Sequence, residues 1–109
     1  MFNYFDMNEN YSRAIPDKWR HMANVFEALG DVHRQRLVLS FEPGERLNVG
    51  QLAEVSTLSR STVSHHLKLL RLSGVLASEK IGKEVYYWVN KDFLQEVLGD
   101  VSDYLQTHL

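Results

Sequence analysis

The stretch LSRSTVSHHLKLL, residues 58–70, decides the fold of this chain. Ser59 is a suitable N-cap, because its hydroxyl can accept a hydrogen bond from a backbone amide of the first helical turn. Apolar residues then recur at Val63, Leu67 and Leu70, a spacing that predicts one buried stripe of an α-helix. The opposite side carries short polar side chains and cations: Arg60, Ser61, Thr62, Ser64, His65 and Lys68.

This polar side has two interpretations. The solvated face of an ordinary amphipathic helix has a similar composition. A helix that enters the DNA major groove needs hydrogen-bonding groups for the base edges and cations for the flanking phosphates. The residues before and after the helix favour the second interpretation.

A shorter helix is predicted just before this one. Asn48 and Gln51 have the spacing of a capping box, in which each residue bonds the backbone of the other. Residues 56–58 then leave room only for a tight turn before Ser59. Two short helices joined in this way form a helix-turn-helix, whose second member enters the groove.

A β-hairpin is predicted after the helix, which Gly74 ends at a C′ position. Residues 75–81 and 84–89 are strand-like runs separated by two residues, Gly-Lys, as in hairpins with a primed turn. The second run is rich in β-branched and aromatic residues, as a half-buried strand should be. Two lysines flank the tip and make the hairpin a basic wing: Lys80 and Lys83.

With these elements in order, residues 17–108 resemble the ArsR/SmtB winged-helix repressors, small dimeric regulators of bacteria and archaea. One departure is Thr57, where the turn of such motifs often has a glycine to accept a positive φ. The resemblance covers about five-sixths of the chain, and its motifs keep the family's order and spacing. They are Ala28-Leu29-Gly30-Asp31 with Arg34 and Arg36-Leu37, Gln51-Leu52-Ala53, residues 61–70, Ser73-Gly74-Val75-Leu76 and Val85-Tyr86-Tyr87.

The expected fold is mainly α with a small β-hairpin, a winged helix-turn-helix of about five helices and a two-stranded wing. Residues 1–16 form an N-terminal arm, either mobile or packed on a partner subunit, and residues 17–109 form one domain. A short strand beside the wing is possible at residues 47–49. Within the domain we expect the DNA-binding motif at residues 48–73, the wing at 75–89 and dimerisation helices at 17–29 and 91–108.

The last helix is expected to begin at Asn90, with Asp92 in its positive first turn. Its apolar residues follow a heptad-like spacing, which has two explanations. The seam either closes the core of its own chain or packs on a second subunit. The family resemblance implies the second arrangement, a two-fold dimer joined through Trp19, Met22, Phe26, Leu94, Leu98, Val101 and Leu105. Such a dimer presents two recognition helices about one DNA turn apart, which read an inverted repeat.

Composition agrees with a single domain of 109 residues. The absence of cysteine excludes disulfides, thiol switches and thiolate metal sites. Net charge is −2, yet residues 59–91 hold six Lys and Arg against two Glu, a net charge of +4 that leaves −6 for the remainder. This local concentration of positive charge favours phosphate binding. With no apolar run long enough to cross a bilayer and no signal peptide, we expect a cytoplasmic protein.

Metal sites known in the family lack their counterparts here. The stretch that corresponds to its cysteine site, residues 47–51, has no soft ligand, and on the last helix Asp100 and Asp103 share a face from which His108 is displaced by about 80°. Zinc requires three or four ligands in tetrahedral reach. We therefore expect no metal and no cofactor, and no catalytic residues, because no nucleophile–base pair or Gly-rich phosphate loop occurs.

The sequence thus predicts a sequence-specific DNA-binding transcriptional repressor. It would act as a homodimer on an inverted-repeat operator and be released by an unidentified signal. Two alternatives are a metal-responsive repressor with His and Asp ligands and a winged-helix module for protein–protein interaction. The predicted DNA contacts are Ser59, Arg60, Ser61, Thr62, Ser64, His65, Lys68, Lys80 and Lys83.

Overall fold

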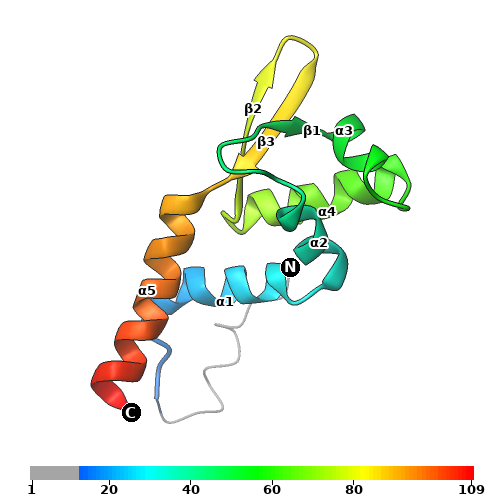
Figure 1. The fold of residues 1–109 in the computed structure, drawn as a ribbon. Coiled ribbons are helices and arrows are strands. Elements are labelled where there is room, and N and C mark those ends of the chain that lie inside the picture. Colours follow the sequence, from blue (N-terminus) through cyan, green and yellow to red (C-terminus); the bar gives the residue numbers. More distant parts are fainter. Residues whose placement is uncertain (1–12) are drawn as a thin grey trace.

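The computed structural model describes residues 13–109, which fold into five α-helices and a three-stranded sheet (Figure 1). The predicted fold class, a mainly helical winged helix-turn-helix, is confirmed. The first twelve residues of the predicted N-terminal arm lie outside the described part of the chain. In chain order the elements are α1 (Trp19–Leu29), α2 (Val32–Leu39), β1 (Leu47–Asn48), α3 (Val49–Glu54), α4 (Arg60–Leu72), β2 (Leu76–Ile81), β3 (Glu84–Val89) and α5 (Lys91–His108).

Both helices of the helix-turn-helix begin with the predicted caps. Asn48 and Gln51 form a reciprocal capping box at the start of α3, with both hydrogen bonds 2.9 Å long. At the start of α4 the Ser59 hydroxyl accepts a bond from the Thr62 amide at 3.2 Å. Among the described residues only glycines have a positive φ, so the turn at Thr57 does not need the glycine that is common at this position.

The wing belongs to a sheet with the strand order β1-β3-β2, all antiparallel. The short strand named at residues 47–49 is present as β1, which pairs with β3 through Leu47 and Tyr87 and adds a third strand to the two of the wing. Gly82 has φ +63° and Lys83 does not have a positive φ, which is the pattern of a type II′ turn. The hairpin tip extends away from the helices (Figure 1).

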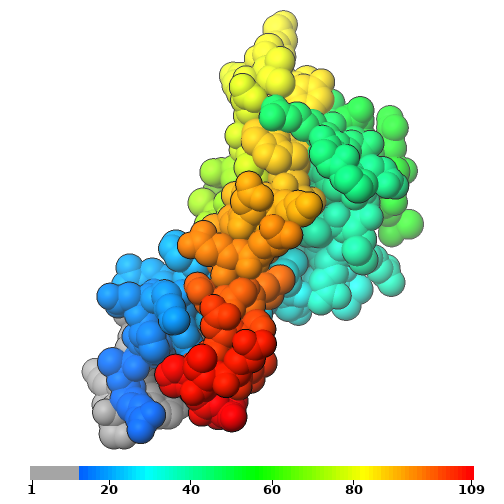
Figure 2. Space-filling view, turned by 60° about the vertical axis from the view of Figure 1, so that its left-hand side comes forward, coloured from blue at the N-terminus to red at the C-terminus, as the bar shows by residue number. Residues whose placement is uncertain are grey.

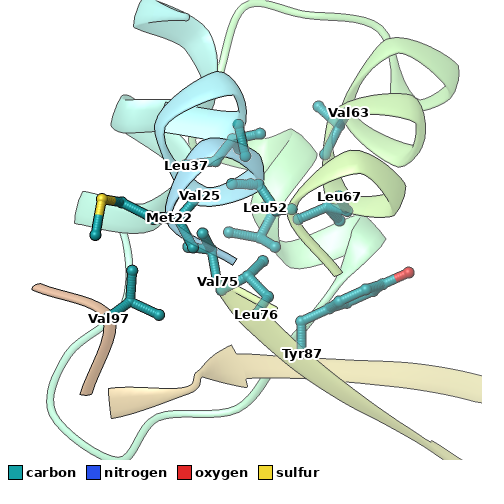
Figure 3. Close-up of a cluster of buried hydrophobic side chains, with 12 residues drawn as sticks. Met22, Val25, Leu37, Leu52, Val63, Leu67, Val75, Leu76, Tyr87 and Val97 are labelled. Atoms are coloured by element: carbon teal, nitrogen blue, oxygen red, sulfur yellow. The ribbon is translucent and has the colours of Figure 1, made fainter. Parts of the chain in front are cut away.

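The core lies between α4, α1, α3 and the base of the sheet (Figure 3). Val63, Leu67 and Leu70 of α4 are fully buried, as their spacing predicts, and the Tyr87 ring of β3 closes the cluster beneath α4. From α1 the core receives Met22, Val25 and Ala28.

One helix start differs from the expectation, and one predicted cap lacks its side-chain hydrogen bond. The first helix begins at Trp19 and not at residue 17, because the Trp19 amide donates to the Pro16 carbonyl in a preceding turn. At the start of α5, Asn90 occupies the N-cap without a side-chain hydrogen bond.

Helix α5 follows the wing directly and crosses the N-terminal end of α1 (Figure 1). The space-filling view shows the start of the described chain beside α5 (Figure 2). Val97 is its one residue in the buried core among those described. Gly74, at the end of α4, has φ +88°, and a Cβ there would lie 2.5 Å from the Phe93 ring of α5. Glycine is thus required at this junction both by the backbone and by the close approach of Phe93.

Candidate nucleic-acid interface

Helix α4 presents the predicted polar side to solvent. Its buried stripe of Val63, Leu67 and Leu70 faces the core, and most other positions of the first three turns are exposed. All seven predicted contact residues on or next to α4 are exposed: Ser59, Arg60, Ser61, Thr62, Ser64, His65 and Lys68. A continuous row of hydroxyl, imidazole and ammonium groups therefore covers the side of the helix that is turned away from the core.

The first turn of α4 holds its hydroxyl groups in a small network. The Ser59 hydroxyl lies 2.8 Å from the Thr62 hydroxyl and 3.2 Å from the Ser61 hydroxyl. Because Ser59 also caps the helix, its position is fixed by the backbone. Thr62 and Ser61 are thereby oriented before any partner binds, which lowers the entropic cost of a hydrogen bond to a base or a phosphate.

Arg60 lies between the two helices of the motif. A Cβ added to Gly50 in α3 would be 3.4 Å from the Arg60 guanidinium, so this side chain runs along the first turn of α3. The absence of a side chain at residue 50 makes room for the guanidinium. The cation consequently stands at the junction of α3 and α4.

The wing separates its charges between the two faces of the sheet. Neighbouring residues of a strand point to opposite faces, and directly paired residues share a face. Lys80 pairs with Val85, on the face that carries the buried Tyr87, whereas Glu79 pairs with Tyr86 on the other face. Lys80 is therefore on the α4 side of the sheet, and Lys83 is at the exposed tip.

Sequence reasoning missed Arg46, which lies next to the wing. Its guanidinium donates to Glu79 at 2.9 Å and stacks over the Trp88 ring, with 4.0 Å between Cζ and the ring centroid. Arg46 and Glu79 are 33 residues apart in the sequence, so no local pattern reveals the pair.

A second set of contacts that sequence reasoning missed links α4 to α1 through Arg34 of α2. The Arg34 side chain donates to the Ala28 carbonyl at 2.6 Å and the Glu27 carbonyl at 3.3 Å, which lie in the last turn of α1. Its Nη1 lies 3.4 Å from Nδ1 of His66, which must accept because an arginine only donates. Burial lowers the pKa of His66 below its ordinary value of 6.5, the nearby Asp31 opposes this, and Arg34 adds to it.

The seven predicted dimerisation residues fall into two groups. Met22 is buried within its own chain, and Trp19, Leu94 and Val101 are partly buried against the core. The others expose about half of their surface: Phe26 (50 %), Leu98 (49 %) and Leu105 (54 %). Helices α1 and α5 thus carry uncovered apolar side chains.

Comparison with known proteins agrees with this architecture. Residues 31–78 match the family described as "Bacterial regulatory protein, arsR family". The transcriptional repressor SdpR of Bacillus subtilis is 30 % identical over 84 residues, which cover 77 % of this chain and 92 % of SdpR. This chain belongs to the arsR family.

Two further similarities fit this assignment. The transcriptional repressor SmtB homolog of Synechocystis is 34 % identical over 83 % of this chain and 67 % of its own length. An ArsR-like regulator from Rhodococcus sp. RHA1 shares the fold, with a TM-score of 0.73 at 24 % identity over 81 % of this chain and 82 % of that chain. The prediction of a DNA-binding transcriptional repressor of this family is confirmed at the level of the family.

Within residues 13–109, no group of three or more His, Cys, Asp or Glu side chains is arranged to hold a metal ion. Asp100, Asp103 and His108 accordingly do not converge, and the His108 ring instead stacks on Tyr104 with 4.9 Å between centroids. In the same part of the chain, none of the helices has the length and apolar character that a bilayer crossing requires.

Proposed function

We propose that this arsR-family protein represses transcription by binding an inverted-repeat operator as a homodimer. The observation that carries the proposal is the exposed polar side of α4, which lies opposite a fully buried stripe and beside a lysine-bearing wing. Hydroxyl, imidazole and ammonium groups suit the base edges and phosphates of a major groove.

We assign base contacts to the middle of the exposed side of α4. Thr62 and His65 are one turn apart and exposed, so both can reach the base edges of one half-site. The remaining predicted contacts serve the phosphates and the orientation of the helix. They are Ser59, Arg60, Ser61, Ser64 and Lys68 on α4, and Lys80 and Lys83 on the wing.

The homodimer forms, in this proposal, through α1 and α5. Phe26, Leu98 and Leu105 are half-exposed apolar residues on these two helices, and burying them would remove apolar surface from water. A hollow of about 560 Å³ beside Phe26 is lined by further apolar residues of α1, including Trp19 and Met22. A second copy offers the same surface in return, as two-fold symmetry requires.

Binding to a duplex from the region upstream of the gene, measured by fluorescence anisotropy at two salt concentrations, tests the proposal. The affinity should fall steeply as salt rises, because bound phosphates release counterions. A protein–protein module would show no such binding.

Two variants test the assigned roles. Lys83→Ala should weaken binding to all duplexes about equally, whereas His65→Ala should change the preferred operator sequence. If both variants bound the operator as the unmodified protein does, this assignment of the interface would be wrong.

A further inference from the structure

Arg46 connects all three strands of the sheet. It precedes β1, its guanidinium lies over Trp88 of β3, and its Nη1 donates to Glu79 of β2 at 2.9 Å. The register explains this path, since Leu47 pairs with Tyr87 and the preceding residue comes level with Trp88. A planar guanidinium can stack on a ring and donate to a carboxylate at the same time.

The outer part of the wing is exposed within the described part of the chain. Strand β1 pairs with β3 at only two positions, whereas β2 and β3 pair at six and extend beyond the helices (Figure 1). Residues 79–84 are all exposed. The angle of the hairpin tip relative to α4 therefore depends on contacts near its base.

The pairing of charges indicates what Arg46 does. Its positive charge is already matched by Glu79, on the sheet face opposite to Lys80. A phosphate contact by Arg46 would have to compete with this ion pair. A role in holding the wing requires no change in the contacts with Glu79 and Trp88.

We propose that Arg46 is a positioning residue for DNA binding, which fixes the hairpin at the angle where Lys83 reaches the duplex. The inference rests on the proposed function, because it requires Lys83 to contact DNA. Arg46 acts through the wing and makes no contact with DNA itself.

A double-mutant cycle between Arg46 and Lys83 tests this role. Operator affinity is measured at one fixed salt concentration for the unmodified protein, Arg46→Ala, Lys83→Ala and the double variant. We expect Lys83→Ala to weaken operator binding about fivefold in the unmodified protein. In the Arg46→Ala background the same change should weaken binding less than about twofold, because Lys83 contributes little to binding when the wing is no longer held at the required angle. Thermal unfolding followed by circular dichroism verifies that each variant is folded.

Arg36→Ala provides the matched control, because Arg36 is an exposed arginine on α2, which is not part of the sheet. In that background Lys83→Ala should retain its full fivefold effect. Equal effects of Lys83→Ala with and without Arg46 would overturn the positioning role and leave the wing contact intact. No effect of Lys83→Ala in the unmodified protein would overturn the wing contact and the role of Arg46 together.

Discussion

Helices α4 and α5 carry apolar residues at similar helical spacing, yet these residues are buried to different extents. In α4, Val63 and Leu67 are fully buried, whereas in α5 Leu98 and Leu105 are 49 % and 54 % exposed. In the DNA-binding half of the molecule the stripe of α4 is therefore covered within one chain, although Leu72 of the same helix is exposed. The half formed by α1 and α5 contributes to the same core, but it leaves part of its apolar seam in contact with water. The spacing of apolar residues shows that a helix face is to be covered, but it does not show whether the same chain covers it.

The largest effect is expected where the DNA-binding half depends on its own core. Leu67→Ala should lower the free energy of unfolding by about 3 kcal/mol, because it removes a fully buried side chain and leaves a cavity. Urea unfolding measures the change. Leu72→Ala on the same helix is the control, since Leu72 is 57 % exposed and its truncation should cost less than about 1 kcal/mol.

The next effect concerns the half formed by α1 and α5, which exposes apolar side chains. The double variant Leu98→Asp, Leu105→Asp should give monomers and lower operator affinity about a hundredfold, about 2.7 kcal/mol, because one half-site replaces two. Analytical ultracentrifugation and fluorescence anisotropy measure the two quantities. Leu39→Asp, at an 82 % exposed position on α2, should change neither. A double variant that remained dimeric would place the interface elsewhere.

A smaller effect is expected at the start of the recognition helix. Ser59→Ala should lower the free energy of unfolding by about 1 kcal/mol, because the Thr62 amide loses its capping acceptor. Ser64→Ala, in the second turn and exposed, serves as the control and should be nearly neutral in stability. If the two variants had equal stability, the cap would contribute nothing to the DNA-binding half.

The smallest effect tests the connection between the two halves at Arg34 and His66. Because the pKa of His66 is lowered in the folded state, the unfolded state binds the proton first. The free energy of unfolding should be at its full value above about pH 6.5, as far as it depends on His66, and should decline as the pH falls through the lowered pKa of His66. Asp31 does not titrate in this pH range. Hydrogen bonding from the Arg34 amide lowers the pKa of Asp31 below its ordinary value of 3.8, so its contribution to the free energy of unfolding is lost only at more acidic pH.

Urea unfolding between pH 7.5 and pH 5 measures this dependence. His66→Gln keeps an acceptor for Arg34 but has no titrating group, so its stability should change less over this range. An unchanged slope in His66→Gln would show that other groups cause the pH dependence.

Local sequence signals predicted the parts of the interface that local chemistry determines. Three features were predicted because each depends on neighbours within a few residues. They are the capping box of Asn48 and Gln51, the Ser59 cap and the hairpin turn at Gly82. The exposure of the polar side of α4 followed from the same helical period that buries Leu67.

The contacts between distant segments were not predictable in this way. Arg46 meets Glu79 only because β1 pairs with β3, and Arg34 meets His66 only because α2 packs on α4. The inward face of α1 depends on packing in the same way, since Val25 and not Phe26 enters the core. Helical spacing admits several faces, and the choice depends on the packing partner.

The separation of charge along the chain has a consequence for the approach to DNA. Residues 59–91 carry a net charge of +4, while α5 alone contains four acidic residues. A molecule with such a dipole experiences a torque in the electric field of a polyanion, so it turns its recognition helix toward the duplex before the first collision. We expect this alignment to raise the association rate at low ionic strength and to vanish as dissolved ions shorten the range of the field.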